Sequence, residues 1–153
     1  MLRTLTFALL FLVSNASAQT TFNQEYMNGN TQIISHSTLE NADGSFLIAG
    51  NADTSINGLQ GGAGFIKKTN PAGIEQWTKY YTFPGTFGVE LNKIIKTADS
   101  NYVVVGSIDF GFGIGPTFVD ALICKVDTAG NLLWAKWYGD VGTDAVKDIR
   151  EMP

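Results

Sequence analysis

The sequence predicts an all-β fold, namely an incomplete β-propeller with two four-stranded antiparallel blades and the first strand of a third. First, a module of about 56 residues is repeated: SFLIAG, which contains Phe46, returns as NYVVVG, which contains Tyr102. Second, the apolar runs are short and bounded by turn residues. Third, residues 46–49 are apolar at consecutive positions, so both faces of this strand need cover, which neighbouring blades supply. A β-sandwich is the alternative, because strand spacing and turns fit both architectures.

Residues 1–18 are expected to be a signal peptide. Arg3 gives a basic start, an apolar stretch follows, and Ala16-Ser17-Ala18 is typical of a cleavage site. The apolar stretch is shorter than the roughly 20 residues that a spanning helix needs, so we expect no membrane span after cleavage. Residues 19–30 are interpreted as an N-terminal linker. Export would place the protein outside the cell or at the outer cell surface.

The first repeat is expected over residues 31–86, with strands near 31–39, 45–51, 64–69 and 74–82. The first two strands are joined by Asn41-Ala42-Asp43-Gly44, whose Asp-Gly pair favours a tight hairpin. The last two are joined by Asn70-Pro71-Ala72-Gly73, which follows the preferences of a type I turn. The loop between the second and third strands, residues 52–63, is Gly-rich and is expected to be exposed and mobile.

The second repeat is expected over residues 87–142, with strands near 89–97, 101–108, 119–126 and 131–138. Asp127-Thr128-Ala129-Gly130 repeats the second turn of the first unit, and residues 107–118 repeat its long loop. Large rings also recur, as Trp77 with Trp134 and Tyr81 with Tyr138. We expect these rings to fill the space between blades.

Residues 143–153 resume the first strand of a third repeat, with Ile149 in the place of Ile94. A closed propeller takes about four to eight blades. The sequence is therefore expected to be the N-terminal fragment of a longer polypeptide, whose missing C-terminal blades would be partners of these two. A short protein that closes by self-association is the alternative.

The second copy carries a spaced motif, formed by Asp127, Gly130, Trp134, Lys136, Tyr138 and Gly139. With the hairpin turns and Gly-rich loops, it resembles the repeats of secreted Gram-negative bacterial β-propeller proteins, which often carry type IX secretion sorting tails. The first copy has Thr82 where that motif has glycine, and this sequence contains no sorting tail. The resemblance implies an architecture and is silent on chemistry, because the matching positions serve packing and turns.

The composition argues against a nucleic-acid partner. The chain has 14 acidic and 10 basic side chains and a formal net charge of −4, whereas nucleic-acid binding depends on Lys and Arg that neutralise phosphates. Cys124 is the only cysteine, so no intramolecular disulfide can form. It lies in the apolar run ALICKVD, with the only histidine, His36, far away in sequence, which favours a buried structural thiol over a nucleophile.

No residue is predicted to be catalytic, to bind a cofactor or to hold a metal. GFGIG at 111–115 and DFG at 109–111 lack the flanking elements of nucleotide-binding motifs. Oxygen-bearing side chains at alternate positions have a calcium-like spacing, but glycine falls at Gly58 and a terminal Glu is missing, so a solvated turn is favoured; they are Asn51, Asp53, Ser55 and Asn57.

Two further groups of side chains were considered as sites. Scattered carboxylates could converge in the fold, although turn chemistry and solubility are the favoured interpretation; they are Glu40, Asp99, Asp120 and Asp144. Aromatic residues of the second long loop could form a platform for a sugar or a protein, although packing on their own blade is favoured; they are Phe110, Phe112 and Phe118.

The functional hypothesis is a secreted or cell-surface module that binds an unknown protein or glycan ligand without catalysis. One alternative is the N-terminal part of a propeller enzyme, either a quinoprotein dehydrogenase or a polysaccharide lyase or hydrolase. Another is a structural spacer of a large adhesin.

Overall fold

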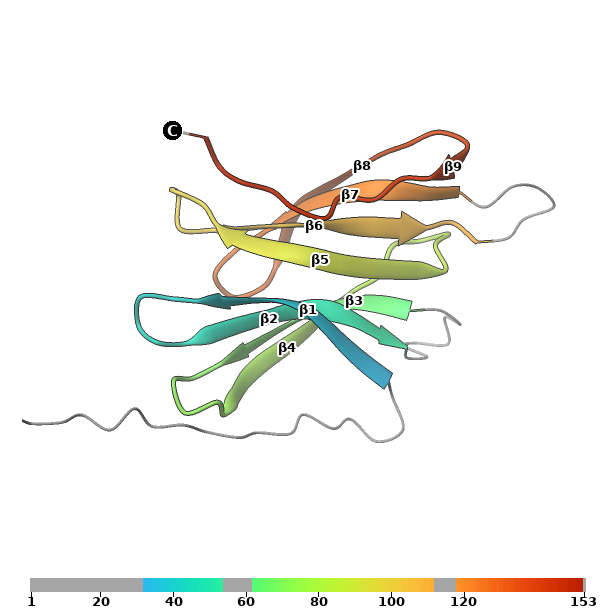
Figure 1. Cartoon of the computed structure of the whole chain (residues 1–153). Coiled ribbons are helices and arrows are strands. Elements are labelled where there is room, and N and C mark those ends of the chain that lie inside the picture. Colours follow the sequence, from blue (N-terminus) through green and yellow to red (C-terminus); the bar gives the residue numbers. More distant parts are fainter. Residues whose placement is uncertain (1–31, 54–61, 112–117, 153) are drawn as a thin grey trace, which may run out of the picture.

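The described residues form two antiparallel β-sheets stacked on each other (Figure 1). The structure is a computed structural model that describes residues 32–53, 62–111 and 118–152. Within these ranges there is no helix, and hence none that could cross a membrane. The predicted signal peptide and the whole of the predicted linker lie outside the described residues.

Each sheet is a meander of four strands that follow one another along the chain. The first sheet consists of β1 (Gln32–Glu40), β2 (Phe46–Asp53), β3 (Gly62–Thr69) and β4 (Glu75–Tyr81). The second consists of β5 (Gly88–Lys96), β6 (Tyr102–Asp109), β7 (Phe118–Val126) and β8 (Leu132–Tyr138), and the short β9 (Gly142–Thr143) pairs parallel with β7. The predicted all-β fold with two four-stranded antiparallel blades is confirmed.

The hairpin turns form for the reasons that the sequence indicates. Asn70 Oδ1 accepts hydrogen bonds from the backbone N–H groups of Ala72 and Ile74, at 3.0 and 2.9 Å. In the second blade, Asp127 Oδ1 accepts from the equivalent N–H groups of Ala129 and Asn131, at 2.9 and 2.8 Å. Such Asx side chains replace backbone partners within a turn. The two blades therefore reverse direction at equivalent positions.

Both blades also bend at the same place. The register shifts by one residue at His36 between β1 and β2, and at Asn92 between β5 and β6, as in a β-bulge. Gly50 and Gly106 lie opposite these bulges, and a Cβ atom at either glycine would collide with a carbonyl oxygen of the bulged strand. The bulge thus requires glycine on the neighbouring strand.

The core lies between the sheets. From the first sheet it contains Leu47, Ala49, Ile66 and Tyr81, and from the second Val89, Leu91, Ile94, Tyr102, Val104, Ile108, Leu122, Cys124 and Val126. Strand β5 lies across β1, β2 and β3 of the first sheet. The hydroxyl of Tyr102 donates to Asn41 Oδ1 at 3.1 Å and links the sheets at one end of the core.

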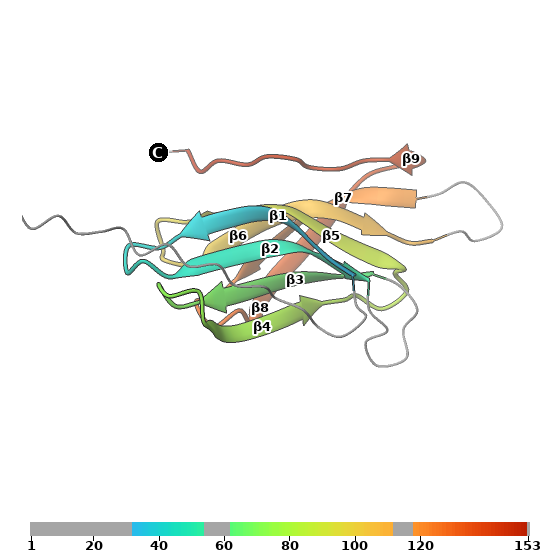
Figure 2. The same cartoon turned by 60° about the horizontal axis from the view of Figure 1, so that its bottom comes forward.

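Strand β6 of the second sheet is covered on both faces, as expected for a strand inside a propeller blade. Val104 packs in the core, so Val103 and Val105 point to the opposite face, yet they are 9% and 0% exposed. Residues 144–152 run along this face as an extended segment (Figure 2). Its Val146 N–H donates to the carbonyl of Gly106 at 3.1 Å. The segment predicted to begin a third blade thus lies on sheet 2, in a position like that of β5 on sheet 1.

Candidate functional site

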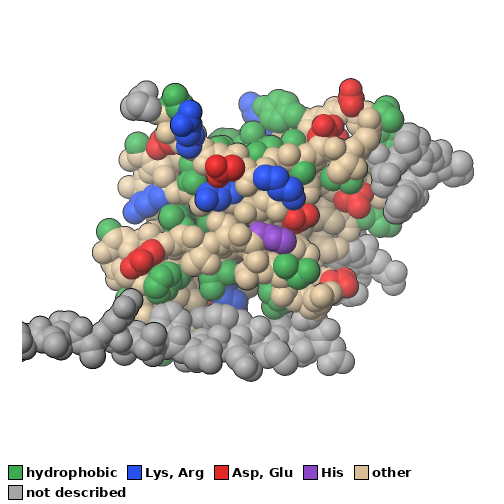
Figure 3. Space-filling view, viewed as in Figure 1, with side chains coloured by type: hydrophobic (Ala, Val, Ile, Leu, Met, Phe, Trp, Pro, Cys, Tyr) green, Lys and Arg blue, Asp and Glu red, His purple; other side chains and the backbone are tan. Residues whose placement is uncertain are grey.

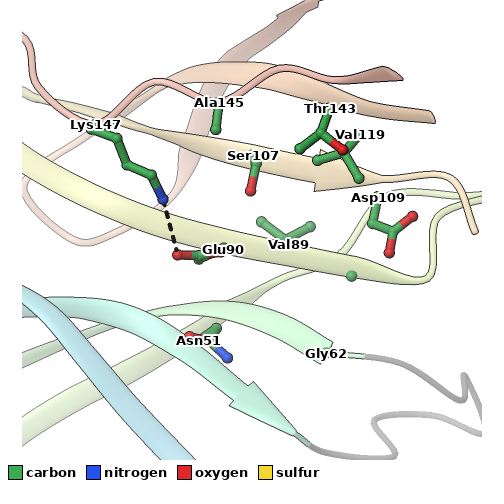
Figure 4. Close-up of a pocket in the computed structure, with 11 residues that line it drawn as sticks. Asn51, Gly62, Val89, Glu90, Ser107, Asp109, Val119, Thr143, Ala145 and Lys147 are labelled. Atoms are coloured by element: carbon green, nitrogen blue, oxygen red, sulfur yellow. Dashed lines mark ion pairs between the residues drawn. The ribbon is translucent and has the colours of Figure 1, made fainter. Parts of the chain in front are cut away.

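A pocket of about 460 Å³ opens where both sheets meet the C-terminal segment (Figure 4). Its wall combines residues of β2 and β3, the beginning of β5, the end of β6, the beginning of β7, and residues that follow β8. The lining residues are Asn51, Gly62, Gly88, Val89, Glu90, Ser107, Asp109, Val119, Thr143, Ala145 and Lys147. Side chains from three repeats therefore share one cavity.

Glu90 is the charged centre of this pocket. Its Oε1 atom lies 3.6 Å from Lys147 Nζ and 3.5 Å from His36 Nε2. The His36 Nε2–H also donates to Asn51 Oδ1 at 2.8 Å. On the space-filling surface, basic and acidic side chains and the histidine lie next to one another across this face (Figure 3). The site therefore contains hydrogen-bond donors and acceptors at short range.

The repeat itself brings these side chains together. His36 is the extra residue in the bulge of β1, and Asn92 is the extra residue in the bulge of β5. Lys147 occupies the matching position of the C-terminal segment, in the alignment that places Ile149 on Ile94. A bulge re-aims the side chain that it carries. A polar residue thus occupies the equivalent position in each of three successive repeats.

The far end of the pocket is held by the connection between the two sheets. Phe87 accepts a hydrogen bond from Gly62 N–H at 2.9 Å and donates its own N–H to the carbonyl of Asp109 at 2.7 Å. The Asp109 side chain accepts from Gly111 N–H, also at 2.7 Å. Phe87 is 55% exposed, and its ring lies against Gly111. Backbone hydrogen bonds of Phe87 thus tie together strand ends that line the cavity.

This arrangement suits recognition of a polar ligand. The lysine ammonium donates only, the carboxylates of Glu90 and Asp109 accept only, and the hydroxyl groups of Ser107 and Thr143 can do both. Among the described residues, no three His, Cys, Asp or Glu side chains are grouped so that they could hold a metal ion.

The predicted calcium-like spacing falls partly on this pocket. Asn51 lines it, and Asp53 ends β2 nearby. Ser55 and Asn57 lie outside the described residues, as does Gly58, so the calcium hypothesis stays a sequence-based one. The GFGIG string also lies outside the described residues, except for its first glycine, Gly111.

The structure brings two of the four singled-out carboxylates together. Asp120 and Asp144 both lie against Gly139, where a Cβ atom would contact the two carboxyl groups. Asp99 lies at a hairpin turn, and its hydrogen bond from Lys125 at 2.6 Å lowers the pKa of its carboxyl group. Glu40 ends β1. The contacts of Asp99 therefore agree with the favoured interpretation, a role in turn chemistry.

The aromatic residues of the second long loop separate. Phe110 packs on Trp137 with ring centroids 6.2 Å apart, whereas Phe118 begins β7 and is 39% exposed. Phe112 lies outside the described residues. Cys124 is buried, and burial raises the pKa of its thiol to about 12, as expected of a structural cysteine.

Sequence reasoning did not single out Glu90, Ser107 or Lys147. Each is an ordinary polar residue in its own segment, and only Lys147 aligns with a bulge position, that of Asn92. No protein-family model matches the chain, and the comparison with curated proteins finds no match either.

Proposed function

We propose that this protein is a secreted or cell-surface β-propeller repeat module that binds a protein or glycan ligand without catalysing a reaction. The observation that carries the proposal is the pocket of about 460 Å³, in which Glu90, Asp109 and Lys147 converge. A pocket of this size accommodates a small ligand or one or two sugar units.

The chemistry of the lining favours a ligand rich in hydroxyl or amide groups. Carboxylates accept from hydroxyl groups, and the ammonium group of Lys147 donates to them. Phe87, next in sequence to the lining residue Gly88, is 55% exposed, and an apolar sugar face or an aromatic side chain can pack on such a ring. Glu90, Ser107 and Asp109 belong to hydrogen-bonded strands, which lowers the cost of ordering the site.

The charged groups are already engaged with one another, which favours binding over acid–base chemistry. Glu90 faces two cationic or potentially cationic groups, and Asp109 accepts a backbone hydrogen bond. A glycosidase needs instead two carboxyl groups on either side of a scissile bond.

The test is a screen of the whole chain against glycan and peptide arrays, followed by calorimetric titration of the hits. Lys147→Met should weaken binding at least tenfold, because it removes the charged donor of the pocket. Lys93→Met is the matched control: Lys93 is also paired with a carboxylate, Asp148 at 3.7 Å, but does not line the pocket. Equal affinity of both variants, or turnover of a bound glycan, would contradict the proposal.

A further inference from the structure

The face of sheet 2 that points away from sheet 1 is only half covered. Residues 144–152 lie over Val103 and Val105. Beyond them, two large side chains of β8 face solvent on the same side of the sheet: Trp134 and Tyr138 are 41% and 57% exposed. We call this exposed part, together with residues 144–152, the open blade face.

The equivalent face of sheet 1 is more completely covered, and it shows what covers such a surface. Strand β5 lies over β1, β2 and β3, and the turn between β7 and β8 lies over the last strand, β4. Trp77 and Tyr81, which match Trp134 and Tyr138, pack there against the core. The Tyr81 hydroxyl donates to the carbonyl of Gly130 at 2.8 Å, and Gly130 lies directly on the Trp77 ring.

The C-terminal segment also has an edge suited to strand pairing. The N–H groups of Asp144 and Val146 donate to the carbonyls of Val119 and Gly106. Successive backbone groups of an extended chain point to opposite sides, so the N–H groups of Ala145 and Lys147 point away from sheet 2. Within the described part of the chain, these two groups have no backbone acceptor. Strand β5, at the equivalent position, uses its edge to pair with β6 from Gly88 to Lys96.

We propose that the open blade face is a docking site for a three-stranded antiparallel sheet of the same repeat type. The first strand of this partner pairs with residues 144–152 by β-augmentation. The turn between its last two strands accepts a hydrogen bond from the Tyr138 hydroxyl and packs a glycine on Trp134. Ala145 and Lys147 also line the ligand pocket, but the docking contacts use their backbone together with Trp134 and Tyr138, which do not line it.

An intact second copy does not fit this site. Its own β1 would have to take the position that residues 144–152 already occupy, since both correspond to β5. The partner must therefore bring the equivalents of β2, β3 and β4 without a first strand. Continuity with the interface between sheets 1 and 2 specifies both its fold and its register.

The test extends the chain by a copy of residues 99–142 attached after Pro153, the position that aligns with Ala98. Hydrogen exchange monitored by mass spectrometry should slow at least tenfold in residues 132–138 and 144–152, relative to the chain without the extension. Unchanged exchange in both segments, with the extension itself folded, would overturn the proposal.

Two variants sharpen the test. Tyr138→Phe should lower the unfolding midpoint of the extended chain but leave that of the original chain unchanged, because only the extended chain offers the acceptor. Ala145→Pro removes one edge N–H and should abolish the slower exchange of residues 144–152. An equal effect of Tyr138→Phe in both chains would contradict the assigned hydrogen bond.

A second measurement covers the case in which the extended chain does not fold. A synthetic peptide of residues 99–109, which contains the β6 sequence, is added to the original chain, with a scrambled peptide as control. Slower exchange of residues 144–152 with the first peptide alone supports the docking site, and no difference between the peptides overturns it. Sedimentation of the original chain as a dimer with residues 132–138 protected would also overturn it.

Discussion

Tyr81, at the end of the first sheet, donates its hydroxyl to the backbone carbonyl of Gly130 at 2.8 Å, although 49 residues separate them. Gly130 has a φ of +78°, and a side chain there would run into Trp77. The turn of one blade is thus fitted against the last strand of the preceding blade. Burial raises the pKa of Tyr81, so its phenol stays protonated and able to donate.

Replacing Tyr81 by Phe should lower the free energy of unfolding by about 1 to 2 kcal/mol, because the carbonyl of Gly130 would lose its donor inside the interface. Urea denaturation followed by circular dichroism measures the change. Tyr138→Phe is the matched control, since its ring is 57% exposed, and it should shift stability by less than about 0.5 kcal/mol. Equal effects of the two changes would argue against a role for the hydrogen bond.

Gly106→Ala should destabilise the protein by at least about 2 kcal/mol, because the new methyl group would collide with the carbonyl oxygen of Glu90 at the bulge. Thermal unfolding measures the loss. In the control Gly62→Ala, the Cβ atom meets nothing closer than 3.6 Å, so a small effect is expected. A Gly106→Ala protein as stable as the wild type would show that the bulge can relax.

Acid should weaken the hairpin at Asp99. The hydrogen bond from Lys125 is the largest of the contacts that lower the pKa of Asp99 below its ordinary 3.8. A carboxyl group with a lowered pKa in the folded state stabilises the fold above its unfolded pKa, and this stabilisation is lost as the pH falls through the folded value. Melting temperatures measured between pH 6 and pH 2 should therefore fall less steeply for Asp99→Asn than for the wild type.

Asp148→Asn serves as the control for that experiment. Asp148 is also close to a lysine, at 3.7 Å from Lys93, but its side chain is 79% exposed. If this variant changed the acid response as much as Asp99→Asn, a general charge effect would explain the result better than the turn.

Cys124 should resist thiol reagents in the folded protein. Burial raises its pKa to about 12, so little thiolate exists near pH 8, and the side chain is 1% exposed. Absorbance with a disulfide reagent should show almost no reaction in buffer and stoichiometric reaction in denaturing urea. Rapid labelling of the native protein would mean that β7 opens readily.

Much of the fold could be predicted because its signals are local. Turn residues such as Asn70 and Asp127 act on backbone groups within four residues, and they form the hairpins expected of them. The apolar run at 102–105 needs cover on both faces, and the structure provides it. The predicted first strand of a third blade lies alongside sheet 2, but only Gly142–Thr143 pair as a strand.

The candidate site could not be predicted in the same way. Glu90, His36 and Lys147 come from three repeats, and each segment alone has an ordinary polar residue at that position. The bulges at His36 and Asn92 were also missed, because one inserted residue leaves the apolar pattern nearly intact.

The sequence by itself determined the strands, their order along the chain and the hairpins that join them, since alternation of side chains and turn chemistry are properties of neighbouring residues. Only the tertiary structure decided which polar groups share the pocket and which apolar surfaces stay open. Those outcomes depend on how one twisted sheet lies on the next, and this packing joins residues about 50 positions apart, as in the bond from Tyr81 to Gly130.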